Sequence, residues 1–132
     1  MKNIEVSAAI IVKDKKVYVT QRGYGQFKDL WEFPGGKLEE NETPEQTIVR
    51  EIKEELDADI KVVKYLNTIE YDYPTFHLTM HCFICELKTD HIVLLEHEAA
   101  KFVDIEDFNL VNFLPADKII LEEIIDYVKA VK

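Results

Sequence analysis

Apolar and polar residues along this chain follow two different periods. Apolar runs bounded by turn residues predict strands, whereas apolar residues spaced three and four apart predict helices. Strands are expected at residues 4–12, 17–22, 60–71, 76–87 and 100–104, and helices at residues 44–56 and 115–129. The first two strands are predicted to form a hairpin around a Lys-Asp-Lys-Lys turn. Because strands and helices are mixed without regular alternation, we predict an α/β (α+β) fold with a mixed β-sheet sandwiched between helices.

Length and hydrophobicity limit the class of protein. A chain of 132 residues with 47% hydrophobic residues suits one domain over residues 1–132 with a single core. No stretch approaches the roughly 20 apolar residues of a membrane span, and the N-terminal sequence lacks the long apolar region of a signal peptide. We therefore expect a cytoplasmic protein without a membrane partner, acting as a monomer or a homodimer.

The charge of the chain narrows its possible ligands. With 26 acidic and 16 basic residues the formal net charge is −10, which disfavours binding to duplex nucleic acid. An acidic protein can still bind a small polyphosphate when divalent metal ions lie between its carboxylates and the ligand.

Neither the cysteines nor the histidines form a metal-binding pattern. Cys82 and Cys85 lie in one predicted strand at an odd separation, so they should point to opposite faces and pack there without bridging each other. A zinc site is not expected, because there is no second cysteine pair. The four histidines lack helical metal-ligand spacing and are expected to pack on strands or face solvent.

Scarce residue types gather in one short segment. The four glycines and the single tryptophan all lie in QRGYGQFKDLWEFPGGK, at Gly23, Gly25, Trp31, Gly35 and Gly36. The only two arginines are Arg22, in the same segment, and Arg50, in the predicted helix that follows. An arginine fork is not interchangeable with a lysine point charge, so both arginines are candidate functional residues.

The predicted helix at 44–56 has clear start signals and two stripes. Thr43 as N-cap, Pro44 at the first position and Gln46 at the third form a capping box. The expected apolar stripe consists of Ile48, Val49, Ile52 and Leu56, and the neighbouring acidic stripe consists of Glu51, Glu54 and Glu55. Like charges at these spacings each cost about 0.2–0.5 kcal/mol. The acidic stripe is thus either a solvated helix face or a divalent metal site.

A motif around this helix favours the metal site. The residues match the spacing G-x5-E-x7-R-E-U-x-E-E, where U is a bulky apolar residue, at Gly36, Glu42, Arg50, Glu51, Ile52, Glu54 and Glu55. Chance agreement is on the order of 1 in 100,000. This pattern is the Nudix box, and the chain resembles the Nudix hydrolases. The family has Gly and an apolar residue after the box where this chain has Asp57 and Ala58, and Asp tolerates the left-handed cap conformation.

The resemblance extends to the MutT branch of the family. It is carried by the segments VYVTQR, LWEFPGGKLE, ETPEQ, IEYDYP and FLPAD. It implies a hydrolase that uses Mg²⁺, or Mn²⁺, to split a nucleoside triphosphate into a monophosphate and pyrophosphate, with 8-oxo-dGTP-like substrates and a role in nucleotide pool sanitation. Three alternatives remain open: a CTP or dCTP pyrophosphohydrolase, a hydrolase of ADP-ribose or dinucleoside polyphosphates, and a silent nucleotide sensor.

The resemblance also implies a set of site residues. The implied metal ligands are Glu51, Glu54, Glu55, the carbonyl of Gly35 or Gly36, and Glu96 with Glu98 as its competitor. Glu51, Glu54 and Glu96 are the candidate general bases, and Arg50 is expected to pair with a carboxylate of the box.

Five further residues are candidates for substrate binding. Arg22 is expected to bind a phosphate or to form a surface salt bridge, and Lys37 could add a point charge. Phe33 and Tyr73 could lie against the base or pack in the core. Asp117 could read a base edge or serve as a first-turn helix residue.

Overall fold

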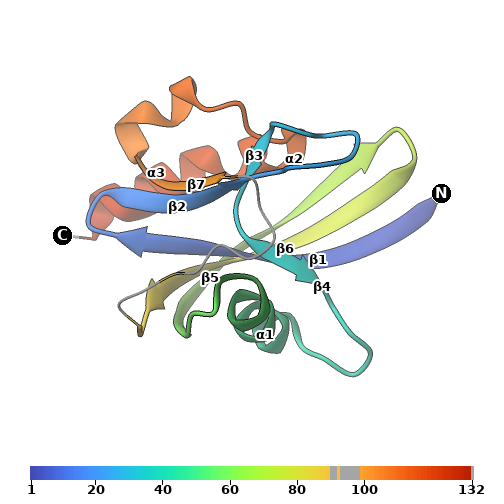
Figure 1. The fold of residues 1–132 in the computed structure, drawn as a ribbon, viewed down its shortest axis with the longest axis horizontal. Coiled ribbons are helices and arrows are strands. Elements are labelled where there is room, and N and C mark those ends of the chain that lie inside the picture. Colours follow the sequence, from blue (N-terminus) through green and yellow to red (C-terminus); the bar gives the residue numbers. More distant parts are fainter. Residues whose placement is uncertain (90–91, 93–98, 132) are drawn as a thin grey trace.

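The computed structural model describes residues 1–89, 92 and 99–131. Strands and helices follow in the order β1 (Lys2–Lys13), β2 (Lys16–Gln21), β3 (Trp31–Glu32), β4 (Gly35–Lys37), α1 (Pro44–Leu56), β5 (Ile60–Tyr73), β6 (Phe76–Leu87), β7 (Ala99–Asp104), the 3-10 helix η1 (Ile105–Leu110), α2 (Pro115–Ile119) and α3 (Leu121–Ala130). Figure 1 shows α1 on one side of the strands and the C-terminal helices on the other. The predicted mixed sheet between helices is confirmed.

Strand β1 is the centre of the sheet. The main strand order is β3-β2-β1-β6-β5, with β4 paired to β1 and β7 paired to β2. The predicted hairpin of β1 and β2 is present, with Val12 opposite Val17. Along the rest of its length β1 runs parallel to β6 and antiparallel to β4. The β1–β6 pair makes the sheet mixed, because the other strand pairs within the described residues are antiparallel.

Two apolar clusters lie on the two faces of this sheet. On one face α1 buries Ile48, Ile52 and Leu56 against a cluster that includes Cys85. On the other face α3 and the turn before it bury Ile120, Ile124 and Val128 in a cluster that includes Cys82. The cysteines therefore point to opposite faces, as predicted, and burial raises the pKa of the Cys85 thiol to about 12. Both thiols are packing residues.

The structure corrects the predicted apolar stripe of α1. Val49 is 43% exposed, whereas Glu55 is buried beside Leu56. At 100° per residue, Glu55 lies about 20° from Ile48 around the helix, while Val49 lies about 100° away. One member of the predicted acidic stripe therefore belongs to the buried side of the helix.

Two further boundaries differ from the prediction. The expected helix at 115–129 is interrupted at Ile120, whose ψ of −9° departs from helical geometry, so α2 and α3 are separate. Strands β3 and β4 lie in the segment expected to be a loop, and they are too short to show a period of two. No helix in the described ranges is both long and apolar enough to span a membrane.

Candidate functional site

Local signals at both ends of α1 are as predicted. The Thr43 hydroxyl accepts the Gln46 N–H at 3.1 Å, and the Gln46 side chain accepts the Thr43 N–H at 3.0 Å. Asp57 ends the helix in the left-handed conformation with φ 48° and ψ 41°. The Ser7 hydroxyl donates to the Pro44 carbonyl at 2.8 Å and so joins the helix start to β1. These contacts fix the position of the acidic face of α1 relative to the sheet.

Arg50 connects the acidic residues of the motif. Its Nε and Nη2 donate to the two carboxylate oxygens of Glu42 at 2.7 and 2.9 Å. Its Nη1 donates to Glu51 at 2.8 Å and to Glu54 at 3.2 Å, and Nη2 also donates to the Lys37 carbonyl at 3.1 Å. The predicted pairing of Arg50 with box carboxylates is thus present. Hydrogen bonding to Arg50 lowers the pKa of Glu42 to about 2.

Two glycines of β4 permit close approach on both sides of the strand. A Cβ on Gly35 would overlap the Ser7 carbonyl and lie 2.9 Å from the Ala8 Cα. A Cβ on Gly36 would meet the Glu51 carboxylate, with Oε1 at 2.7 Å. Gly35 therefore allows β4 to pack against β1, and Gly36 leaves room for the Glu51 carboxylate beside the strand.

The acidic residues differ in burial. The Glu51 side chain is 16% exposed, the Glu54 side chain is 58% exposed, and Glu55 is buried. Within residues 1–89, 92 and 99–131, no three acidic, histidine or cysteine side chains converge as a metal-binding group. Glu96 and its competitor Glu98 lie outside the described residues.

The donor chemistry of this region fits a hard divalent cation. Glu51 lies against the Gly36 backbone, and Glu55 lines the same pocket as Gly35 and Gly36. Carboxylate and carbonyl oxygens are the ligands that Mg²⁺ prefers. The guanidinium of Arg50 offsets the repulsion between neighbouring carboxylates. The metal ligands implied by the resemblance are compatible with this arrangement, and they remain a prediction.

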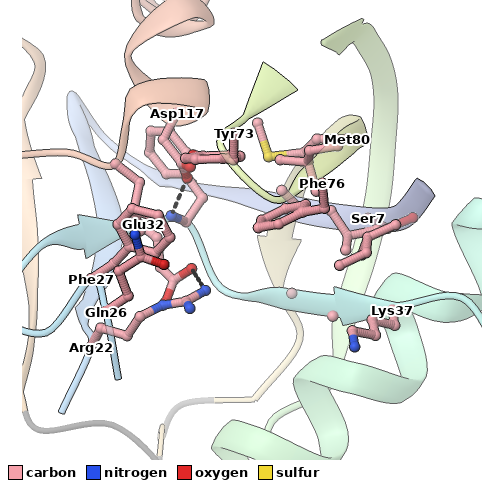
Figure 2. A pocket seen from close by; sticks show the side chains of 18 of the residues that line it. Ser7, Arg22, Gln26, Phe27, Glu32, Lys37, Tyr73, Phe76, Met80 and Asp117 are labelled. Carbon is pink, nitrogen blue, oxygen red and sulfur yellow. Dashed lines mark hydrogen bonds and ion pairs between the residues drawn. The ribbon is translucent and has the colours of Figure 1, made fainter. Parts of the chain in front are cut away.

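A pocket of about 580 Å³ extends from β4 toward α2. Gly35, Gly36, Lys37 and Glu55 line one part of it, and Asp117 lines another. Figure 2 shows Asp117 and Lys37 on opposite sides of this space. The pocket thus joins the Nudix motif to the C-terminal segment that carries the predicted base-reading residue.

Asp117 is a buried acid in the pocket wall. It is only 5% exposed, and its Oδ2 accepts the Phe33 N–H at 3.0 Å. Burial, with a smaller contribution from Glu32, raises the pKa of Asp117 to about 8. The neighbouring Ala116 N–H donates to the Tyr73 hydroxyl at 3.1 Å. Burial therefore favours the protonated form of Asp117. The Phe33 backbone contacts its carboxyl, and Tyr73 of β5 contacts the residue before it.

Arg22 is engaged within the pocket by an acid that the sequence analysis missed. Its Nε and Nη2 donate to the two oxygens of Glu32, each at 3.0 Å (Figure 2). Both residues line the pocket. Of the two roles predicted for Arg22, the structure shows a salt bridge, while phosphate binding remains a prediction. Glu32 gave no sequence signal, because β3 has only two residues.

The two predicted aromatic residues both line the pocket and are both buried. Phe33 stacks on Phe113 with ring centroids 5.3 Å apart, as expected for core packing. Tyr73 stacks on Phe76 at 5.0 Å and meets Phe27 edge-on at 5.1 Å. Phe27 was also missed, because a single aromatic residue in a loop has no periodic signal. Lys37 lies exposed at the β4 end, as its predicted role requires.

Known proteins agree with the motif and the fold. The NUDIX domain sequence model matches residues 1–124. A protein of Proteus vulgaris named 8-oxo-dGTP diphosphatase is 40% identical over 85 residues, which are 63% of this chain and 76% of that protein. A protein of Escherichia coli (strain K12) named CTP pyrophosphohydrolase is 33% identical over 123 residues, covering 92% of this chain and 91% of that protein.

The fold is shared with a solved structure. The solution structure of the E. coli ORF135 protein has a TM-score of 0.84 at 31% identity and covers 99% of this chain and 94% of that chain. Together with the match over residues 1–124 and the observed arrangement of the box residues, this shows that the chain belongs to the Nudix family of hydrolases.

Proposed function

We propose that this protein is a divalent-metal-dependent nucleoside triphosphate pyrophosphohydrolase that releases a nucleoside monophosphate and pyrophosphate. Its proposed substrate is an oxidised purine nucleotide such as 8-oxo-dGTP. The observation that carries the proposal is a continuous pocket that joins Asp117 to Gly36 and Glu55. A volume of about 580 Å³ suits one small ligand. The name 8-oxo-dGTP diphosphatase of the Proteus vulgaris relative supports the same substrate class.

The polyphosphate is proposed to lie along β4 beside α1. Glu51, Glu54, Glu55, a carbonyl of Gly35 or Gly36, and Glu96 are the proposed metal ligands. Mg²⁺ is the proposed ion, with Mn²⁺ as its substitute. Such ions would neutralise phosphate charge and lower the pKa of a bound water. The carboxylate that accepts the proton of the attacking water is proposed to be Glu51, Glu54 or Glu96.

Basic residues have separate proposed roles around this region. Arg50 holds Glu51 and Glu54 by hydrogen bonds and so restricts their rotamers. Lys37, exposed at the β4 end of the pocket, supplies a point charge to the phosphates. The Arg22 guanidinium already donates to both oxygens of Glu32, so a phosphate that binds Arg22 must share this group with Glu32.

The base is proposed to lie at the Asp117 end. A protonated carboxyl both donates and accepts hydrogen bonds, and the raised pKa of Asp117, about 8, favours this form at pH 7. 8-Oxoguanine offers a matching edge, since its N7–H donor lies beside the O6 acceptor. Tyr73 and Phe76 add apolar surface for the ring.

A cytidine nucleotide is the second candidate. Cytosine also presents a donor beside an acceptor, at N4 and N3, so a protonated Asp117 suits it too. The E. coli relative named CTP pyrophosphohydrolase aligns with 92% of this chain. We propose action in the cytoplasm, as a monomer or homodimer, and light scattering would determine the oligomeric state.

A specificity panel tests the proposal. Values of kcat/KM would be measured with Mg²⁺ for 8-oxo-dGTP, dGTP, dCTP, CTP and ADP-ribose, and the released phosphate species identified. Preference for 8-oxo-dGTP with pyrophosphate release is the expected result, and activity should disappear with a chelator. Preference for CTP or dCTP would support the proposed pyrophosphate release but would replace the oxidised purine with a cytidine nucleotide as the substrate. Turnover of ADP-ribose alone, or of nothing, would refute the proposal in favour of the other hydrolase class or of a nucleotide sensor.

A further inference from the structure

A histidine bridges two carboxylates on the side of the β5–β6 hairpin that faces away from the pocket. The His77 Nδ1 lies 2.6 Å from the Asp72 Oδ1, and its Nε2 lies 2.7 Å from the Glu70 Oε1. The Thr79 hydroxyl donates to the same Glu70 oxygen at 2.7 Å. The His77 side chain is 31% exposed. These contacts connect positions on both strands of the hairpin.

Both contacts can be hydrogen bonds to ionised carboxylates only when the His77 ring is protonated. A neutral imidazole has only one N–H, so it can donate to only one of the two carboxylates, whereas the imidazolium donates to both. Asp72 first, and then Glu70, raise the pKa of His77 above its usual value. On the neighbouring strand β1 the position opposite His77 is the uncharged Asn3. Along β6 the next titratable group is His81.

His81 has a separate partner. Its Nε2 lies 2.6 Å from the Glu5 carboxylate of β1. Its Nδ1 lies 2.9 Å from the Thr68 hydroxyl of β5. The carboxylate partner of His81 therefore lies on β1, whereas both carboxylate partners of His77 lie on β5. This difference makes His81 a matched control for His77 on the same face of the sheet.

The bridge of His77 is adjacent to the aromatic wall of the pocket. Asp72 pairs in register with His77, and the next pair toward the turn is Tyr73 with Phe76. Tyr73 and Phe76 line the pocket (Figure 2). Because successive strand residues point to opposite faces, Asp72 and His77 face away from it.

Tyr73 extends this connection to α2. Its hydroxyl accepts the Ala116 N–H at 3.1 Å, and Ala116 directly precedes Asp117. A shift of the hairpin tip would therefore move both the aromatic wall and the first turn of the helix that carries Asp117.

We propose that His77 is a positioning residue for the base end of the pocket. As an imidazolium it holds Asp72 and Glu70 across the hairpin, keeps Tyr73 in register, and through Ala116 maintains the position of Asp117. This inference rests on the proposed function for its kinetic consequence. The contribution is complete below the usual His pKa of about 6.5 and is lost as pH rises through the raised value in the folded protein.

Kinetics of His77→Gln test the proposal, with His81→Gln as the control. At pH 6 the first variant should raise KM about two- to fivefold, the effect expected of an exposed cross-strand ion pair, with kcat within about twofold of wild type. The KM ratio of variant to wild type should approach one at pH 9. A ratio independent of pH, a loss confined to kcat, or an equal effect of His81→Gln would overturn the role.

A second measurement does not depend on turnover. In pH titrations of the wild-type protein by NMR, part of the chemical-shift change of the Ala116 and Asp117 amides should have the same midpoint as the His77 ring. This part should be absent in His77→Gln. Asp72→Asn replaces His77→Gln if that variant fails to fold. Amides that ignore the His77 titration would refute the connection. If the wild type hydrolyses no nucleotide, the proposed function fails while the amide titration still decides the structural inference.

Discussion

Substituting the two β4 glycines one at a time distinguishes a residue needed for strand packing, Gly35, from a residue needed to place the Glu51 carboxylate, Gly36. In Gly36→Ala the new methyl group overlaps the end of the Glu51 side chain, which can rotate away. Rotation removes the 2.8 Å ion pair between Glu51 and Arg50, at a cost of about 1 kcal/mol, because Arg50 keeps Glu42 as a partner and the Glu51 carboxylate regains water. We expect Tm to change by less than about 5 °C. Turnover should fall about 10- to 100-fold, as when a residue orienting a metal site is displaced.

Gly35→Ala is the matched control, because its methyl group meets backbone instead. The Ser7 carbonyl and the Ala8 Cα, 2.9 Å away, cannot move without separating β4 from β1. We expect a loss of about 2–4 kcal/mol in the free energy of unfolding.

Urea unfolding and steady-state hydrolysis of the preferred nucleotide would be measured for both glycine variants. Full turnover by Gly36→Ala would exclude Glu51 from the chemistry. Wild-type stability of Gly35→Ala would refute the close β1–β4 packing.

Three further predictions concern ionisable residues. Glu54→Gln should leave Tm unchanged, because Glu54 is 58% exposed, yet lower kcat by orders of magnitude if Glu54 is a metal ligand. Asp117→Asn should flatten the pH dependence of unfolding. The raised pKa of about 8 means that the contribution of Asp117 to stability is complete below the usual Asp pKa and is lost as pH rises through about 8, which urea unfolding at pH 5 and pH 9 would measure. Arg50→Lys should lower kcat about 10- to 100-fold and return the Glu42 pKa from about 2 toward its ordinary value. On acidification, Glu42 of the variant is then protonated, and its contribution to stability lost, at a higher pH than in the wild type. An NMR titration of the Glu42 carboxyl would show this difference.

For each of these three variants, one result would contradict the prediction. Near-normal turnover of Glu54→Gln would remove Glu54 from the mechanism. An equal pH slope in Asp117→Asn and wild type would show that Asp117 ionises normally in the folded chain. An unchanged Glu42 titration in Arg50→Lys would show that the bidentate contact does not hold that carboxylate.

Signals local in sequence predicted the structure well. The capping box at Thr43 and the left-handed Asp57 each depend on a few neighbouring residues, and both are present. The spacing of the Nudix motif likewise identified the residues that Arg50 joins. Helix geometry at 100° per residue also explains why Glu55 is buried, although its charge had suggested otherwise.

Features that depend on distant segments could not be predicted from the sequence. The partner of Arg22 comes from a strand of two residues, and strands this short have no period. The buried Asp117 carboxyl accepts the N–H of Phe33, which is 84 positions away in the sequence. No local pattern encodes such a contact, and the burial that raises the pKa of Asp117 likewise depends on segments far apart in the sequence.

The parallel pairing of β1 with β6 has a consequence for how the chain folds. Each paired residue of β1, from Lys2 to Ile11, meets a partner 74 positions later. At synthesis rates of about 5–20 residues per second, roughly 4–15 s separate the appearance of the two strands. During this interval β1 can pair only with nearer segments, such as β2 and β4. Completion of the sheet must close a long loop, so folding should be slow for a chain of this size, and the pocket forms only after its last wall, at Asp117, has been made.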